Sequence, residues 1–257
     1  MFFRRGLWVC CHVVYSIFMA VGNIWTHVNK FVERHLYATT LENEMLYVSK
    51  CAEHFNKTPQ HIVLLLGNET ISYKDLANII LWCVAAGISF VTLYDHDGHL
   101  QQNQDELYQA VKTRSKLCVG TIIWGRNKTL NGLGVENGVQ NGTKAIAKTR
   151  VTVLSLNDSK ETFLKVTRSL CYSAKNREVK SCHISQDVIN EMLIEETGLP
   201  EPELALYCGE VCCTYGFLPW HIRITEFLRL RSHHNITVRE FARLLQTYGK
   251  CEQRFGK

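Results

Sequence analysis

One short run of the sequence holds several side chains that could bind a metal ion. Asp95, His96, Asp97 and His99 directly follow the apolar, β-branched run 88–94. A strand there would place them at the carboxyl edge of an open α/β sheet, where such folds bind ligands. Neighbouring residues on a tight turn rarely all point at one ion, however, and Asp-Gly is an ordinary turn pair. The spacing leaves both a small metal site and a plain turn open.

Other residues that could take part in chemistry have spacings that match known motifs less well. Gly132, Gly134 and Gly138 resemble a dinucleotide-binding fingerprint, but the last interval is one residue too long and no strand leads into a helix there. The eleven cysteines contain no CxxC pair, which is typical of reduced, mostly buried thiols. The sequence also contains no nucleophile elbow, phosphate loop or HExxH motif. Spacing alone therefore identifies no self-sufficient active site.

Composition narrows the class of protein. A chain of 257 residues can bury a core of its own. With 46% hydrophobic residues, 21% charged residues and four prolines, it is neither disordered nor collagenous. The net charge of +5 comes from both signs scattered along the chain, without the basic stripe of a nucleic-acid binder. Nucleic acid is therefore excluded as the main ligand.

Apolar runs alternate with helical patterns along the chain. Ser72 resembles the start of a capping box and Gly87 ends the helix that follows. We expect a further helix at 220–230, opened by Pro219, and an exposed Asn/Gly/Lys-rich insertion at about 125–148. Short apolar, β-branched runs predict buried strands at 62–66, 88–94, 151–156 and 204–208. Strand, helix and strand with short joins predict an α/β fold with an open, mostly parallel sheet flanked by helices.

The N-terminal segment has the pattern of a membrane anchor. After Arg4 and Arg5, residues 7–25 carry no formal charge, and as a helix they would reach about 28 Å, close to the hydrocarbon thickness of a bilayer. Trp8 and Trp25 lie at its two ends, where indoles favour the membrane interface. A cleaved signal peptide and a buried core helix are the alternatives. We predict an anchor in residues 1–30 and an α/β domain in 31–257.

Two longer segments carry a family resemblance. Residues 216–226, GFLPWHIRITE, and the terminal 251–257, CEQRFGK, closely resemble the non-catalytic subunits of the cis-prenyltransferase family. Shorter segments match the same subunits at 82–83, 87–89 and 94–96. The resemblance covers about 60–100 and 150–257 and fails across the insertion. It implies a cis-prenyltransferase fold, an endoplasmic reticulum membrane anchor, and a cytosolic domain paired with a catalytic homologue.

The departures from active members of the family indicate a subunit without its own activity. Active members carry Asp-Gly-Asn after the first strand, whose aspartate helps to hold Mg²⁺, and then arginines that bind phosphate. Here Leu66 precedes Gly67 and Asn68, and no arginine follows. A second family motif, Arg-x-Ser-Gly-Glu, keeps Glu210 and lacks the arginine. The resemblance therefore implies that the partner subunit holds Mg²⁺ and the diphosphates, and that this chain contributes no catalytic residue.

The end of the chain keeps a family motif. Arg254 and Gly256 match an R-x-G that crosses the dimer interface in this family and completes the partner's isopentenyl diphosphate site. Glycine lets backbone N–H groups approach phosphate closely, and arginine offers a bidentate fork. The alternative is a solvated basic terminus. Four apolar residues are candidates for the dimer interface or, equally, for the core: Phe217, Leu218, Trp220 and Ile222.

The sequence thus predicts an accessory subunit of a heteromeric cis-prenyltransferase. With its partner it would condense isopentenyl diphosphate onto farnesyl diphosphate to make dolichol precursors for protein glycosylation. A membrane receptor or scaffold without prenyl chemistry is the alternative, and glycosylation at Asn56 or Asn235 would favour it by placing the domain in the lumen. A third hypothesis is an autonomous enzyme that uses Asp95, Asp97 and Glu210.

Overall fold

The computed structural model describes residues 8, 11–22, 24–25, 28, 40–114, 121–125 and 148–252. The chain divides into two units, Met1–Thr40 and Leu41–Lys257, and the second contains the whole sheet. Almost all of the predicted insertion, and the terminal Arg254 and Gly256, lie outside the described residues.

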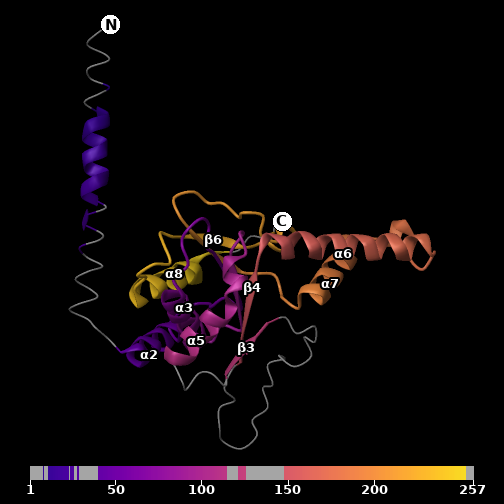
Figure 1. The fold of residues 1–257 in the computed structure, drawn as a ribbon, viewed down its shortest axis with the longest axis horizontal. Coiled ribbons are helices and arrows are strands. Elements are labelled where there is room, and N and C mark those ends of the chain that lie inside the picture. Colours follow the sequence, from indigo (N-terminus) through magenta and orange to yellow (C-terminus); the bar gives the residue numbers. More distant parts are fainter. Residues whose placement is uncertain are drawn as a thin grey trace, which may run out of the picture. The chain divides into compact units, whose positions relative to one another are not determined.

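The second unit is built on one six-stranded parallel sheet with the strand order β3-β4-β2-β1-β5-β6 (Figure 1). Its strands are β1 (His61–Leu65), β2 (Phe90–Tyr94), β3 (Ile122–Trp124), β4 (Thr149–Leu154), β5 (Leu204–Cys208) and β6 (Glu226–Leu230). Every residue of β1, β2 and β4 is buried, which agrees with their continuous apolar character. The predicted α/β fold with a parallel sheet is confirmed.

Helices and short 3₁₀ turns connect these strands. The α-helices are α2 (Leu41–Ala52), α3 (Tyr73–Ala85), α4 (His99–Gln102), α5 (Gln104–Arg114), α6 (Leu156–Lys175), α7 (Gln186–Thr197) and α8 (Val238–Lys250). The 3₁₀ turns are η3 (Ser181–His183) and η4 (Pro219–His221). Only half of the predicted capping box forms at the start of α3. The Asp75 N–H donates to the Ser72 hydroxyl at 3.4 Å, and that hydroxyl donates to the Asp75 carboxylate at 2.7 Å. The Ser72 backbone N–H, which would complete the box, donates to His233 instead.

The larger core lies between the sheet and α3. Helix α3 is buried without interruption from Asp75 to Cys83, and it packs with Val48 of α2 and Phe241 of α8. The rings of Trp82 and Phe241 lie 5.6 Å apart, and the Trp82 indole donates to the Glu44 carboxylate at 3.2 Å. The N-terminal and C-terminal helices of this unit are thereby joined to the first crossover helix of the sheet.

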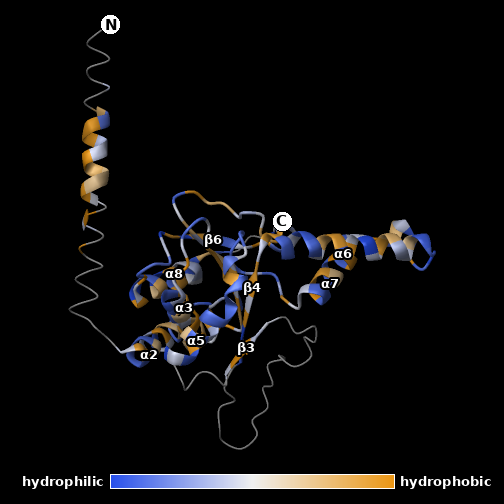
Figure 2. Cartoon of the chain, in the orientation of Figure 1, coloured by the Kyte–Doolittle hydropathy of each residue, from blue (hydrophilic) through white to orange (hydrophobic). Residues whose placement is uncertain are grey.

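The other face of the sheet has a smaller hydrophobic core. Leu65 and Tyr94 pack there with Phe217 and Leu218 from the β5–β6 connection. Helix α6 starts at this face and helix α7 ends at it, and both helices extend away from the sheet (Figure 1). The buried residues of α6 lie between Ser159 and Val166, and hydrophobic and hydrophilic residues are mixed along its length (Figure 2).

Two sequence-based predictions were wrong or found no support. Residues 220–230 were expected to be a helix, but they form the end of η4 and strand β6, because Phe227 and its neighbours pair in register with β5. In the N-terminal unit, residues 11–22 are helical. Across the residues that the structure describes, no helix is both long and apolar enough to cross a membrane, so the predicted membrane helix is not supported.

His61 makes the stability of this unit dependent on pH. The His61 ring is 1% exposed, its Nδ1–H donates to the Pro200 carbonyl at 2.7 Å, and its Nε2 accepts from the Thr92 hydroxyl at 2.8 Å. Burial lowers the pKa of His61 from 6.5 to about 4. The folded state therefore binds fewer protons than the unfolded state between these values, and stability is lost as the pH falls from 6.5 towards 4.

We predict that His61→Gln weakens this loss of stability. A pKa lowered from 6.5 to about 4 corresponds to roughly 3 kcal/mol at most. Urea unfolding at pH 7 and pH 4.5 should therefore show a smaller drop in the free energy of unfolding for His61→Gln than for the unaltered chain. The exposed His183→Gln is the matched control, and an identical drop in all three proteins would contradict the assignment.

Candidate functional site

The loops after β1, β5 and β6 meet at the carboxyl edge of the sheet. Strand β1 pairs with β2 on one side and with β5 on the other, so the chain leaves β1 in one direction and returns on its opposite side. Such a switch in strand order is the place where open α/β sheets bind ligands. The candidate site is therefore the edge formed by residues 66–72, 208–210 and 231–235.

The loop after β1 begins with a tight turn. Leu66 is 1% exposed and belongs to the core, so an apolar side chain fills the place where active family members have their aspartate. Gly67 has φ +65°, and a side chain there would lie 3.1 Å from the Tyr215 hydroxyl. Asn68 points to solvent as an exposed residue, and Glu69 is turned toward the β6–α8 loop. Gly67 and Asn68 thus form the turn, and Glu69 forms the polar contacts.

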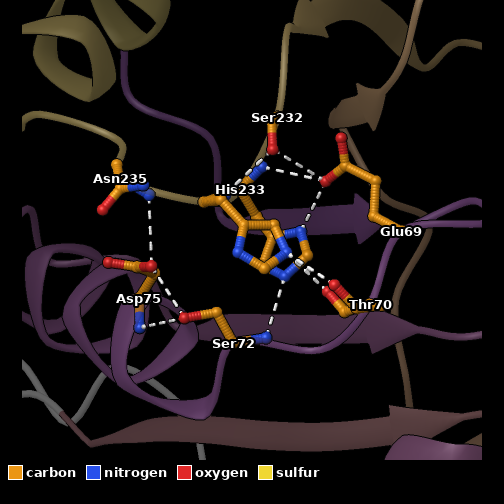
Figure 3. Close-up of polar contacts among 8 residues, drawn as sticks. Glu69, Thr70, Ser72, Asp75, Ser232, His233 and Asn235 are labelled. Carbon is orange, nitrogen blue, oxygen red and sulfur yellow. Dashed lines mark hydrogen bonds and ion pairs between the residues drawn. The ribbon is translucent and has the colours of Figure 1, made fainter.

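The carboxylate of Glu69 is the acceptor for three donors of the β6–α8 loop (Figure 3). Its Oε2 accepts from the Ser232 hydroxyl at 3.0 Å, from the His233 imidazole Nδ1–H at 2.7 Å and from the His233 backbone N–H at 3.3 Å. The His233 side chain is fully buried, while 25% of the Glu69 side chain is exposed. These bonds tie the first loop of the sheet to the last one.

The hydrogen bond to the second ring nitrogen of His233, Nε2, determines the tautomer of the ring. The Ser72 backbone N–H donates to His233 Nε2 at 3.1 Å, so Nε2 is an acceptor and the proton of the neutral ring is on Nδ1. Burial lowers the pKa of His233, which favours this neutral form. Beside it, Asp75 accepts from the Asn235 backbone N–H at 3.1 Å. The start of α3 is thus bonded at two points to the β6–α8 loop.

Cys208 completes a group of three residues with metal-binding side chains. One ligand atom each from Glu69, Cys208 and His233 lies within 4.8 Å of the others. A cation between them would need the electron pair of His233 Nδ1, which carries the proton donated to Glu69. It would also need a thiolate, and burial raises the pKa of the Cys208 thiol. The geometry is that of a hydrogen-bonded network and does not favour a metal centre.

The Asp95–His99 segment is the turn that the sequence left as one of two alternatives. Asp95 is buried, its Oδ2 accepts from the Leu100 backbone N–H at 2.9 Å, and its Oδ1 accepts from the Asp97 N–H at 3.2 Å. His96 stacks on the Tyr215 ring at 4.9 Å, and both Asp97 and His99 are exposed. Ligand atoms of Asp95, His96 and Asp97 do lie within 4.8 Å of one another. The carboxylate of Asp95, however, is used to shape the start of α4.

The other predicted site residues are divided between surface and core. Glu210 is exposed and forms an ion pair with Arg229. Phe217 and Leu218 are almost completely buried in the chain's own smaller core, whereas Ile222 is half-buried. Trp220 is also half-buried, and its indole N–H donates to the Asn190 side chain. Of the four interface candidates, only Trp220 and Ile222 retain exposed surface that a partner can contact.

Sequence reasoning missed the residues that hold this edge together. It assigned no role to Glu69, Ser232 or His233. The Ser-His-His run at 232–234, two residues before the Thr237 helix cap, was the available signal. Its significance depends on which strand lies beside β1, and this becomes visible only in the folded sheet.

Comparison with known proteins places the chain in a family. No protein-family model matches it. It is 32% identical over 204 residues to the dehydrodolichyl diphosphate synthase complex subunit NUS1 of Homo sapiens, covering 78% of this chain and 68% of that protein. It is 31% identical over 207 residues to the subunit of the same name from Saccharomyces cerevisiae, covering 74% of this chain and 55% of that one.

A solved structure shares the fold of this chain at lower sequence identity. The crystal structure of lavandulyl diphosphate synthase from Lavandula x intermedia, in complex with dimethylallyl diphosphate, superimposes with a TM-score of 0.56. The match covers 78% of this chain and 99% of that one at 14% sequence identity, which shows a common fold. The identity to the human subunit over most of both chains shows that this protein belongs to the NUS1 family of dehydrodolichyl diphosphate synthase complex subunits.

Proposed function

We propose that this chain is the accessory subunit of a heteromeric cis-prenyltransferase. Paired with a catalytic homologue, it takes part in condensing isopentenyl diphosphate onto farnesyl diphosphate to make dolichol precursors. The observation that carries the proposal is the 32% identity to the human complex subunit over 204 residues. The parallel sheet, which has the fold of a diphosphate synthase, is consistent with it.

The residues at the carboxyl edge support a non-catalytic role. Departure of a diphosphate from an allylic carbon requires positive charge, from a metal ion and guanidinium groups, to stabilise the leaving group. Here Leu66 is apolar and buried, and Glu69 is bonded to Ser232 and His233. These residues do not fit Mg²⁺, which prefers several free oxygen ligands in octahedral geometry. We therefore assign Mg²⁺ and the phosphate-binding arginines to the partner subunit.

The C-terminal tail is the part of this chain that we assign to the shared site. Helix α8 ends at Lys250, and Arg254 and Gly256 follow beyond the described residues. An arginine fork and the backbone N–H groups beside a glycine suit a diphosphate. In this proposal both residues bind isopentenyl diphosphate in the partner's site. Trp220 and Ile222 are the proposed contacts at the subunit interface.

We also propose that the complex acts at the endoplasmic reticulum membrane, with the sheet-containing unit in the cytosol. The described helical residues of the N-terminal unit include large apolar side chains that are more than half exposed within that unit, among them Val14, Ile17, Phe18 and Trp25. Apolar side chains of this kind gain free energy by entering a lipid interface. This location is the one in which dolichol precursors, being membrane lipids, would be released.

The first prediction concerns activity. Incorporation of labelled isopentenyl diphosphate into long-chain product should be at background level for this chain alone. It should rise at least tenfold when the chain is co-expressed with its catalytic homologue, relative to the homologue alone. Equal activity of the homologue with and without this chain would refute the accessory role, and chain elongation by this subunit alone would refute its non-catalytic assignment.

The second prediction concerns the tail. Gly256→Ala and Arg254→Ala should each lower the activity of the complex by tenfold or more, because a lost charge-assisted hydrogen bond is worth about 1.5–3 kcal/mol. Co-purification of the two subunits should be unchanged. Lys257→Ala is the matched control and should retain activity. Loss of assembly in the Gly256 variant would show that the tail holds the subunits together instead.

The third prediction concerns the membrane. The full chain should float with phosphatidylcholine vesicles in a density gradient, and a variant without residues 1–39 should remain at the bottom. Replacement of Ile17 and Phe18 by Ser should weaken flotation, because both side chains are exposed and apolar. Equal flotation of the full and truncated chains would place membrane affinity elsewhere in the protein.

A further inference from the structure

The carboxyl edge around β1 carries hydrogen-bond donors that could hold an oxyanion. Three of them converge on one point: the Ser232 hydroxyl, the His233 backbone N–H and the His233 imidazole N–H. A further backbone N–H, that of Ser72, points into the same region from the start of α3. Backbone and side-chain donors that converge in this way at a sheet edge are the usual means of binding phosphate.

In this chain the convergent donors already have an anion. The Oε2 atom of Glu69 accepts all three bonds from Ser232 and His233, at distances of 2.7–3.3 Å. Bonds from donors to an ionised carboxylate are about twice as strong as neutral ones. Because Glu69 reaches this position from the turn after Leu66, its carboxylate is held beside the donors by the fold itself.

The backbone N–H of Ser72, at the start of α3, also already has an acceptor. The Ser72 N–H donates to His233 Nε2, and the Asp75 N–H donates to the Ser72 hydroxyl. The carboxylate of Asp75 lies on the same side and accepts from the Asn235 N–H. An external phosphate approaching this edge would therefore meet two carboxylates, and the donors that it needs would already be satisfied.

We propose that Glu69 is the resident anion of this sheet edge, and that its carboxylate closes the subunit's own site to phosphate and diphosphate. The inference deepens the proposed function, because it gives a physical cause for a subunit that leaves diphosphate binding to its partner. A tethered carboxylate competes at an effective concentration in the millimolar range or above, which free diphosphate does not exceed. Displacing it would also leave Glu69 without its three donors.

The proposal makes a prediction about removing the carboxylate. Glu69→Ala leaves the Ser232 and His233 donors without an acceptor, and an external anion can then bind them. Titration of the full chain with inorganic pyrophosphate, followed by calorimetry, should show binding at least tenfold tighter in Glu69→Ala than in the unaltered chain. Pyrophosphate should also raise the melting temperature of Glu69→Ala and leave that of the unaltered chain unchanged.

The Glu69→Gln variant distinguishes two ways in which Glu69 could exclude phosphate: by accepting the hydrogen bonds of Ser232 and His233, or by repelling phosphate with its negative charge. Glutamine retains an oxygen that accepts from the same donors and has the same shape, so this variant should stay closed to pyrophosphate. Glu195→Ala, an exposed carboxylate on α7, is the matched surface control and should behave as the unaltered chain. If Glu69→Ala does not fold, Glu69→Ser takes its place, since its hydroxyl can accept one bond through water. Pyrophosphate binding to the unaltered chain as tight as to the variant would overturn the proposal.

A metal ion at Glu69 is the outcome that would replace this inference. The unaltered chain is titrated with Co²⁺, which gives an intense thiolate charge-transfer band when cysteine is a ligand. The proposal expects no such band, because His233 Nδ1 is already bonded to Glu69 and burial raises the pKa of the Cys208 thiol. A band that Cys208→Ser and Glu69→Ala both abolish and Cys213→Ser leaves in place would make Glu69 a metal ligand and overturn its role as resident anion. The binding tests need no partner subunit, so their failure is distinguishable from failure of the proposed function.

Discussion

Parallel pairing of β1 with β2 and with β5 is the constraint on which the rest of this unit depends. Parallel strands cannot be joined by tight hairpins, so every connection crosses a face of the sheet, and the loops after β1, β5 and β6 emerge at one edge. Helix α3 forms the first crossover, from β1 to β2, and is buried along most of its length. The contacts between Glu69, His233 and Ser72 follow from this arrangement, because they join loops that are far apart in sequence.

The same edge supports the proposal that this chain has a synthase fold without a catalytic site of its own. Where an enzyme of this fold needs free carboxylates and cations, this chain has the buried Leu66 and a carboxylate whose donors are supplied internally. The polar groups are satisfied by one another, which stabilises the edge and, in the proposed function, leaves its donors unavailable to substrate. In the proposed function, this subunit pairs with a homologous partner through the shared fold and contributes to the substrate site through its C-terminal tail.

Much of the fold could be predicted from the sequence, because it is encoded locally. Continuous apolar runs gave β1, β2, β4 and β5, and the Ser72 cap gave the start of α3. Strand β6 was missed because Pro219 suggested a helix start, although the following residues pair with β5 in the sheet. The site was harder to predict, since Glu69 and His233 are 164 residues apart and neither belongs to a recognisable motif. Their meeting depends on strand order, which no local pattern contains.

This chain has the fold of a prenyl diphosphate synthase and, in the proposed function, leaves substrate binding at the sheet edge to its partner. Photo-crosslinking of the assembled complex with a benzophenone analogue of farnesyl diphosphate, followed by peptide mass spectrometry, tests this most directly. We expect the crosslinked analogue in the catalytic partner and none in peptides that cover residues 61–76 or 204–212 of this chain. Label in those peptides, competed by farnesyl diphosphate, would contradict it.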